Sequence, residues 1–362
     1  MPAAQTYLDI SQGNRVFDSL YASDLPARVG GGICGPSYSR AVVERAESAP
    51  AEIVPGLLAA TLGEHGDRCR VVSVGLSALG RLVRGLRGDD LLVAIERAPP
   101  PEDHGLAIGI AGRGFGGNLT SDSTRTDGYV LSTDIAPTIL SRFAIAVPSQ
   151  MSGEAIRSKG AIDAAAVESL GKRLAVISSR RGPVIGVSLL AWILVFGLAA
   201  LVGAARVERV AVRLLGLSIV YLPLLLLAGA ALKGGQEAEQ LLVMFGAPLL
   251  AAVTLFALGG LRALAVASAL VVLAYAIDAI AGSPLTSLSL LGPNPGLGVR
   301  FYGIGNELEA LLGVLVLAGT GSGLAAFAPR LGDRGTAGAF LAVALAAAAI
   351  FAAGRFGADV GA

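Results

Sequence analysis

Three glycines in "GRGFGGN" (112–118) have a spacing that suits phosphate binding. Gly112, Gly114 and Gly117 spell G-x-G-x-x-G, a motif in which backbone N–H groups approach a pyrophosphate at the start of a helix. The residues that follow, "NLTSDSTRTDGYV", form a polar stretch without a helical pattern, so we predict no dinucleotide site. The same stretch offers an alternative, a small anion-binding or partner surface formed by Ser121, Ser123, Thr124 and Arg125.

Charged side chains also interrupt the apolar second half of the chain, where burying them in lipid is costly. Asp278 precedes the Gly- and Pro-rich stretch "GSPLTSLSLLGPNPGLGVRFYGIGNELE" (282–309). An interfacial hairpin followed by a helix capped by Asn306 and its acidic neighbours is one interpretation. It leaves Asp278 and Arg300 unexplained, and we predict that these two form an ion pair. The other interpretation is a ligand or ion site at the membrane interface, formed by Asp278, Arg300, Tyr302, Asn306, Glu307 and Asp359.

The composition indicates a polytopic membrane protein. The 362 residues are 54% hydrophobic and only 15% charged, with a mean hydropathy of +0.68. A formal net charge of +1 gives no reason to expect a nucleic-acid partner. Most acidic and basic residues precede "SSRRGP" (178–183), and the chain after Pro183 is nearly all Leu, Ala, Val and Gly. We therefore expect a polar region followed by a membrane region.

Six apolar segments are each long enough to cross a hydrocarbon core of roughly 30 Å. They lie at 184–203, 214–232, 240–258, 263–282, 308–328 and 337–353. Short loops on the cytoplasmic side carry an excess of Lys and Arg. One set of loops has Arg206, Arg209, Arg213, Arg262, Arg330 and Arg334, whereas the alternate set has Lys233, Arg300 and Arg355. This difference predicts residues 1–182 outside the cell, although Arg180 and Arg181 favour the opposite orientation.

Patterns of strand and helix alternate in the polar region. "RCRVVSVG" (68–75), "DDLLVAIER" (89–97) and "LAIGIAG" (106–112) predict buried strands, and "LSALGRLVRGLR" (76–87) predicts an amphipathic helix. Such alternation predicts an α/β sandwich with a mostly parallel sheet. Cys34 and Cys69 can pair in an extracytoplasmic domain, or they can remain two free, buried thiols.

Two further helices are expected before the first span. "TDIAPTILSRFAI" (133–145) has Thr133 or Asp134 as N-cap and Pro137 in its first turn. Its Ile135, Ile139, Leu140 and Phe143 should face the sheet. Residues 160–182 form a connector whose amphipathic helix places on one face Val167, Leu170, Leu174 and Ile177.

The segment "LTSDSTRTDGYVLSTDIAPTIL", followed by "VPSQMSGEAI", resembles the C-terminal part of the alkaline phosphatase superfamily, which includes sulfatases and type I phosphodiesterases. The resemblance covers roughly residues 89–157. It implies an alkaline phosphatase-like α/β domain over 1–159, which we expect to be truncated at its N-terminus. A connector over 160–182 and a transmembrane bundle over 183–362 follow it in our interpretation, and we expect the bundle to be truncated at its C-terminus. "RFYGIGNE" (300–307) and "GADVG" (357–361) are similar to stretches of bacterial membrane proteins, actinobacterial among them, that carry such a domain before many spans.

The superfamily typically holds two divalent metal ions with Asp and His ligands, beside a Ser, Thr or modified Cys nucleophile. This chain has two histidines, His65 and His104. The candidate ligands are Asp9, Asp103 and His104, with Ser11 beside the first. Asp103 and His104 follow three prolines, so they form either a displaced metal corner or a chance triplet in a polar loop. We therefore predict no catalytic residue, no bound cofactor and no metal, unless residues before Met1 supply further ligands.

These observations predict a multi-pass protein of the bacterial cell membrane with residues 1–182 outside. The leading interpretation is a catalytically degenerate phosphatase-like domain that binds or scaffolds, with the bilayer and an envelope glycan or lipid-linked ligand as partners. One alternative is a metal-dependent phosphohydrolase or phosphotransferase acting on a lipid-linked substrate. A second alternative is a transporter built around the acidic and basic residues at membrane depth.

Overall fold

The computed structural model describes residues 3–15, 29–35, 37–96, 105–295 and 301–351. The chain divides into two compact units, Met1–Gly171 and Lys172–Ala362. The division lies inside the long connector helix, so each unit is described by itself. All functional groups discussed below belong to one unit or the other.

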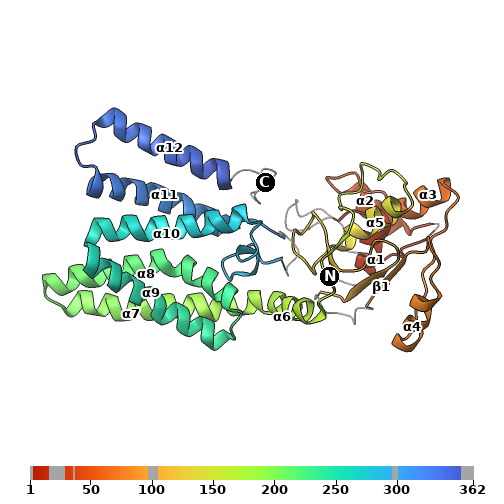
Figure 1. Ribbon diagram of the computed structural model, residues 1–362, viewed down its shortest axis with the longest axis horizontal. Helices are drawn as coiled ribbons and strands as arrows, with labels where there is room; N and C mark the ends of the chain where they lie inside the picture. The colour runs from red at the N-terminus through yellow and green to blue at the C-terminus, as the bar shows by residue number, and fades with distance from the viewer. Residues whose placement is uncertain (1–2, 16–28, 36, 97–104, 296–300, 352–362) are drawn as a thin grey trace. The chain divides into compact units, whose positions relative to one another are not determined.

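Short helices and strands build the first unit (Figure 1). The helices are α1 (Ala3–Gln12), α2 (Arg40–Glu47), α3 (Leu57–Glu64), α4 (Leu76–Gly85), the 3₁₀ turn η2 (Ser132–Asp134) and α5 (Ile135–Arg142). The strands are β1 (Leu92–Ile95), β2 (Ile108–Ala111), β3 (Asn118–Thr120) and β4 (Arg157–Lys159). Helix α6 (Ala164–Arg181) begins in this unit and ends in the second.

The described strands form two antiparallel pairs rather than a parallel sheet. Leu92 of β1 pairs with Ala111 of β2, and Asn118 of β3 pairs with Lys159 of β4. The prediction of a mostly parallel sheet is therefore wrong for these strands. An alkaline phosphatase-like arrangement of the unit stays a prediction, because two short strand pairs do not define one.

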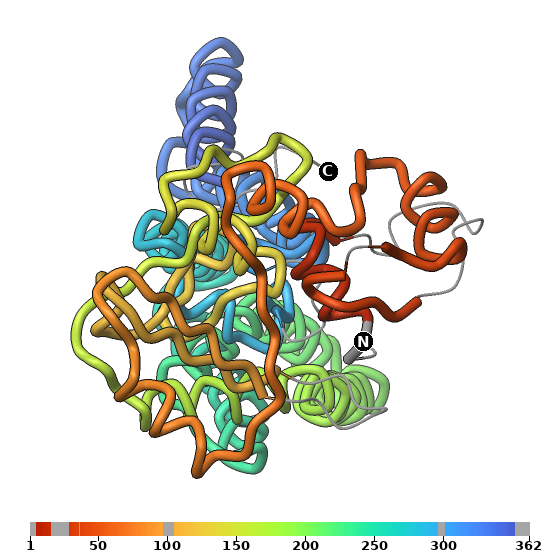
Figure 2. Tube along the Cα trace, turned by 90° about the vertical axis from the view of Figure 1, so that its right-hand side faces the viewer, coloured from red at the N-terminus to blue at the C-terminus, as the bar shows by residue number. Residues whose placement is uncertain are grey.

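Residues 68–75 were predicted as a strand, and this prediction is wrong. The segment has no strand assignment, and Val71 and Val74 are 59% and 47% exposed. Figure 2 draws this part of the chain as an extended orange tube. Valine-rich sequence favours an extended backbone, but a strand also needs a neighbour to receive its hydrogen bonds. The helix that follows, α4, is amphipathic as predicted and has no buried residue.

Helices α1 and α5 form the centre of the first unit. Ile10 of α1 packs with Ile135 and Ile156, while Leu140 of α5 packs with Leu58 of α3. The predicted inward face of α5 is confirmed for Ile135 and Leu140, which are 4% and 0% exposed. It is wrong for Phe143, which is the C-cap of α5 and is 40% exposed.

A disulfide joins Cys34 and Cys69, with 5.6 Å between their Cα atoms. Of the two alternatives that the sequence left open, the structure has the paired one. The bond ties a segment near α1 to the chain after α3, across a separation of 35 residues. Disulfides persist in oxidising compartments and are rare in the cytosol.

Six helices of the second unit are long and apolar enough to cross a membrane. They are the continuous helix 164–202, which includes α7 (Val187–Val202), then α8 (Ala205–Leu232), α9 (Gln236–Leu258), α10 (Gly260–Ile280), α11 (Asn306–Phe327) and α12 (Asp333–Phe351). The six predicted spans lie on these helices and end within two residues of them, apart from 352–353, which lie outside the described residues. The protein is therefore an integral multi-pass membrane protein. Residues 204–213 were expected to form a loop, but helix α8 begins at Ala205 and most of these residues form its first turns.

Small residues let the central helices approach closely. Ala247 and Ala251 of α9 and Ala263 and Ala267 of α10 are all fully buried in one cluster. Helices α10 and α11 form the most extensive pair, and α12 lies beside α11 at one edge of the bundle in both views (Figures 1 and 2). No described residue of α12 is buried, so its side chains are available to lipid.

Helices α6 and α7 are joined without a break by one π-helical turn, Gly182–Gly186. Pro183 lies in this turn and has no N–H to donate to the preceding turn of the helix. A π-helical turn accommodates this loss while the helix continues into the first span. The three arginines at 173, 180 and 181 therefore stand on the same rigid element as the span.

Candidate functional site

Asp134 is the centre of a buried hydrogen-bond network in the first unit. Its side chain is 0% exposed. Oδ2 accepts hydrogen bonds from the Ser121 hydroxyl at 2.7 Å and from the Leu131 backbone N–H at 2.9 Å. Oδ1 accepts from the Ser123 hydroxyl at 2.6 Å and from the Glu154 backbone N–H at 3.0 Å. Four donors occupy a carboxylate that has about four lone-pair sites, so its acceptor capacity is filled.

This network joins the start of α5 to two segments distant in sequence, one containing Ser121 and Ser123 and the other containing Glu154. Asp134 lies at the N-cap position, yet it binds backbone outside the helix and makes no side-chain cap bond to α5. Gly153 must be glycine here, because a Cβ at that position would collide with the carbonyl oxygen of Thr133. The close approach brings the Glu154 N–H to the carboxylate. The sequence correctly identified Asp134 as an N-terminal residue of the helix but not its partners.

The hydroxyls proposed for an anion-binding surface point inward instead. Ser121 and Ser123 donate to Asp134, and the Thr124 hydroxyl donates to the Tyr129 carbonyl at 2.5 Å. Ser121 and Thr124 are 1% and 0% exposed. Of that proposed set only Arg125 is exposed. The surface interpretation is therefore wrong, because Ser121 and Ser123 bind the buried Asp134 carboxylate and Thr124 binds a backbone carbonyl.

The glycine motif at 112–118 leads into strand β3 and not into a helix. A phosphate cradle of this type needs a helix N-terminus directly after the glycines. The prediction that Gly112, Gly114 and Gly117 form no such cradle is thus supported by the element that follows them. Gly117 instead allows close approach to the carbonyl oxygens of Lys159 and Gly160 on the neighbouring strand.

Asp9, the first metal-ligand candidate, is fully buried on α1 beside two amides. Gln5 Nε2 donates to Asp9 Oδ1 at 2.8 Å, Gln12 Nε2 lies 3.4 Å from the same oxygen, and Arg15 Nε is 4.0 Å from Oδ2. Ser11 donates to the Leu8 carbonyl at 2.7 Å. Asp103 and His104 lie outside the described residues. Within the described ranges no group of three or more His, Cys, Asp or Glu side chains comes together to hold a metal ion.

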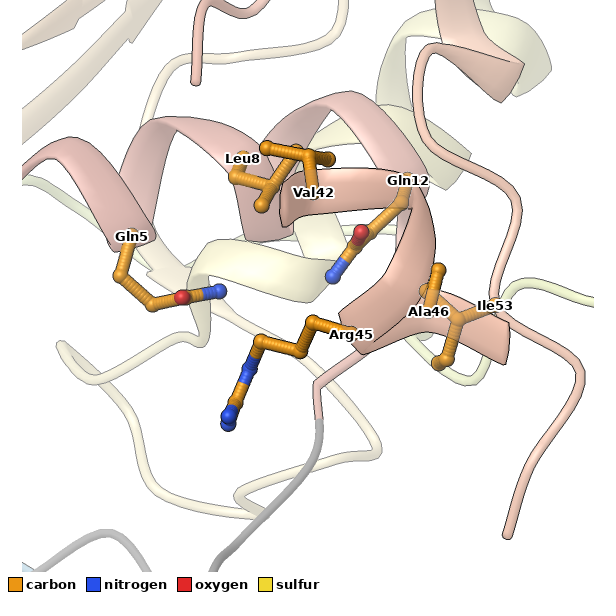
Figure 3. Close-up of a pocket in the computed structure, with 7 residues that line it drawn as sticks. All are labelled: Gln5, Leu8, Gln12, Val42, Arg45, Ala46 and Ile53. Carbon is orange, nitrogen blue, oxygen red and sulfur yellow. The ribbon is translucent and has the colours of Figure 1, made fainter. Parts of the chain in front are cut away.

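A small pocket opens between α1 and α2 in the first unit (Figure 3). Its cavity volume is about 20 Å³, which leaves room for little more than one water molecule. Its lining residues are Gln5, Leu8, Gln12, Val42, Arg45, Ala46 and Ile53. The Gln5 and Gln12 amides beside it bind Asp9, as described above. The pocket therefore offers few uncommitted polar groups for a ligand.

The second cluster lies at the end of the bundle where α10 is followed by residues 281–295, here called the outer loop because the orientation predicted from the sequence places it outside. Asp278, near the end of α10, is 5% exposed. Its Oδ2 accepts from the Thr286 hydroxyl at 2.6 Å and the Thr286 N–H at 2.8 Å, and its Oδ1 accepts from the Leu285 N–H at 3.0 Å. This carboxylate caps the short 3₁₀ helix η4 (Thr286–Leu288) and fixes the fold of the outer loop.

The remaining residues of the predicted interface site are only partly placed. Arg300 and Asp359 lie outside the described residues, so the predicted Asp278–Arg300 pair stays a prediction. Asn306 and Glu307 are exposed in the first turn of α11. The N-cap of α11 is Gly305 and has no side-chain cap bond, which corrects the predicted cap by Asn306. Tyr302 is partly buried in the segment before it.

Three arginines of α6 bind the outer loop and α9, which no pattern in the sequence predicted. Arg173 Nη1 lies 2.5 Å from Glu239 Oε1, and Arg180 Nη1 lies 3.0 Å from Glu239 Oε2. Arg173 also donates to the Leu288 carbonyl at 2.8 and 3.0 Å, and Arg181 Nη2 donates to the Gly292 carbonyl. Glu239 is 3% exposed. Its neighbour Glu237 is exposed on the same helix turn, and helical spacing alone did not distinguish them.

Comparison of this chain with models of known protein families, with curated proteins and with solved structures finds no match in any of the three. The six membrane-spanning helices, the disulfide and the two buried carboxylate networks are therefore the basis for the function proposed below.

Proposed function

We propose that this protein is an integral membrane protein of the bacterial cell envelope whose first unit is an extracytoplasmic, non-catalytic domain that binds or scaffolds. The occupied carboxylate of Asp134 is the observation that carries this proposal. Asp134 is the only acidic residue of the phosphatase-like "STDIAPTIL" segment. A catalytic metal ligand must leave an oxygen free for the ion, and both Asp134 oxygens hold two donors each.

The disulfide supports the extracytoplasmic placement. Cys34 and Cys69 are bonded in the first unit, and such bonds persist where the environment is oxidising. The excess of arginines near the three junctions α7–α8, α9–α10 and α11–α12 supports the same placement, because these helix ends lie on the side of the membrane opposite the start of the first span.

Hydrolysis assays test the catalytic half of the proposal. The full chain, purified in detergent, is assayed with p-nitrophenyl phosphate and bis-p-nitrophenyl phosphate in the presence of Zn²⁺, Mn²⁺ or Mg²⁺. We expect no release of nitrophenol above that of the metal-containing buffer. Metal-dependent turnover that is lost in Asp134→Asn, in protein that remains monodisperse, would contradict the proposal.

Crosslinking in intact cells tests the binding half. A photoreactive residue is placed at Val72, which is 48% exposed in the first unit, and another at Ala205 at the start of α8. We expect a discrete adduct with an envelope component from the first position and none of that size from the second. Identical adduct patterns at both positions would contradict a binding role specific to the first unit.

A further inference from the structure

Asn294, in the outer loop, is a buried side-chain amide without a hydrogen-bond partner. The residue is 3% exposed. Neither Nδ2 nor Oδ1 has a partner anywhere in the part of the chain that the structure describes. Leaving a buried donor or acceptor unpaired is costly, so native structures rarely keep such groups without a water or ligand. An amide with both ends unpaired therefore marks a place where a water or a ligand binds.

Arg181 supplies a second unpartnered group, next to the part of the outer loop that contains Asn294. Its Nη2 donates to the Gly292 carbonyl, but its Nε is buried and has no partner among the described residues. Arg173 and Arg180 on the same helix both bind Glu239. Arg181 has no such carboxylate within the described ranges, so its positive charge is not balanced by an ion pair.

The outer loop places Asn294 two residues after Gly292, whose carbonyl accepts a hydrogen bond from Arg181 of α6. Gly292, whose carbonyl receives Arg181, sits where a Cβ would collide with the Thr286 carbonyl, and Thr286 is in turn held by Asp278. Asn294 follows two residues later with a φ of 57°, in the left-handed region that Asn tolerates better than most residues. The turn therefore holds a polar side chain in a buried position beside the contact between Arg181 and Gly292.

The position in the bundle fits a lipid headgroup. Arg181 precedes the π-helical turn that leads into the first span, and the outer loop follows the end of the α10 span (Figure 1). Both residues thus stand where apolar helix surface gives way to polar loop. Arg side chains at this level of a membrane protein extend toward the headgroup region.

We propose that Arg181 and Asn294 bind a lipid headgroup that carries both a phosphate and a hydroxyl. The guanidinium Nε and the Asn294 Nδ2 are donors that suit phosphate oxygens, whereas Asn294 Oδ1 is an acceptor that requires a donor such as a hydroxyl. A buried water can pair with the amide but cannot balance the charge of Arg181. This chemistry is shared by a phospholipid such as phosphatidylglycerol and by a polyprenyl-phosphate-linked sugar.

Lipid titration of the purified full chain tests this inference. Delipidated protein in detergent is titrated with phosphatidylglycerol, with a polyprenyl-phosphate-linked hexose and with phosphatidylcholine, and the thermal unfolding midpoint is recorded. We expect a saturable rise with one of the first two lipids, which identifies the source. Phosphatidylcholine has the phosphate but no hydroxyl, so it should bind roughly tenfold more weakly.

Arg181→Gln and Asn294→Asp are the test variants, and Lys233→Gln is the matched control. Asp keeps the shape of Asn and its tolerance of the left-handed backbone, but it loses the donor and repels phosphate. Lys233 is exposed between α8 and α9 and loses the same charge. Each test variant should weaken the preferred lipid roughly tenfold or more, and the control should bind as the parent does.

Three results would overturn the inference. The first is the absence of a saturable shift with either hydroxyl-bearing lipid. The second is equal affinity in the parent and both test variants. The third is a lower midpoint in the lipid-free variants with unchanged lipid affinity, which would mean that the two side chains only hold waters that support the loop. Hydrolysis by the first unit has no bearing on any of these readouts.

Discussion

Arg180 Nη1 lies 3.0 Å from Glu239 Oε2, so a positive charge just before the first span is paired inside the bundle. Arg180 and Arg181 were the residues that opposed the predicted orientation. Glu239 takes up the charge of Arg180 together with that of Arg173, and both guanidinium groups also bind backbone carbonyls. Arginines that form buried ion pairs and bind backbone carbonyls are weaker signals of membrane orientation than exposed arginines near short loops.

Labelling of introduced cysteines tests the orientation. Cys34 and Cys69 are bonded to each other, so a membrane-impermeant maleimide should not react with them in intact cells. We expect a cysteine at Ser152 to be labelled and one at Ala205 to be labelled only after the cells are opened. Both positions are exposed, so accessibility within the protein does not decide the result. The reverse pattern would place the first unit in the cytoplasm.

Removing the disulfide should destabilise the first unit. Closing a loop of 35 residues restricts the unfolded chain by an amount worth ~4 kcal/mol in the chain-entropy treatment. We expect Cys34→Ser with Cys69→Ser to lower the urea concentration at which residues 1–171 become sensitive to protease in the full chain. Reduction of the parent should reproduce the effect, and reduction of the double variant should change nothing further. Equal protease sensitivity of parent and variant would contradict a stabilising role.

Asp134→Asn should destabilise the first unit by about 3 kcal/mol, because an amide nitrogen would face donors that now bind a carboxylate. Asp122→Asn is the matched control. Asp122 is exposed and pairs with Arg157 at the surface, so its loss should cost below about 1 kcal/mol. The same protease measurement in urea compares the two. Similar losses in both variants would mean that the buried network is less important than its geometry indicates.

Glu239→Gln should lower the thermal unfolding midpoint of the membrane bundle strongly. It leaves Arg173 and Arg180 without their carboxylate, and breaking a buried ion pair from one side costs about 3–5 kcal/mol. Glu237→Gln, two residues earlier in α9 and exposed, is the control and should leave the midpoint nearly unchanged. Fluorescence of the single tryptophan, Trp192, reports the unfolding, because its indole N–H binds the Met244 carbonyl at 2.8 Å across α7 and α9. Equal midpoints in the two variants would show that the ion pairs of Glu239 with Arg173 and Arg180 do not stabilise the bundle.

Stability of the first unit should fall in alkaline solution partly through Tyr129. Burial raises the pKa of the Tyr129 phenol above its usual value of 10.0, with Arg15 acting in the opposite direction and Asp134 in the same one. Because the folded-state pKa is the higher one, the contribution to stability is complete below pH 10 and is lost as the pH rises through the folded-state value. Tyr129→Phe should therefore show a shallower loss of protease resistance than the parent above pH 10. Parallel curves would show that the phenol ionises equally in both states.

Sequence patterns alone located the membrane helices. Runs of apolar residues at 184–203 and 240–258 are long enough to span a bilayer, and no soluble fold buries so many of them in succession. The short helix starting near Asp134 was likewise predictable, since Pro137 in its first turn and the spacing of Ile135 and Leu140 are local signals. These features depend on residues that are near each other in the chain.

The tertiary structure decided the pairings between distant residues. Glu239 and Glu237 are nearly equivalent in sequence, yet only Glu239 faces Arg173 and Arg180. Ser121 and Ser123 look like surface hydroxyls in the sequence. In the structure they bind Asp134, which lies 13 residues after Ser121 and 11 after Ser123. Residues 68–75 have the composition of a strand, but no strand of the described part of the chain pairs with them. The role of a carboxylate, a hydroxyl or a strand edge depends on the group to which it is hydrogen-bonded. Which group that is depends on how distant segments of the chain pack together.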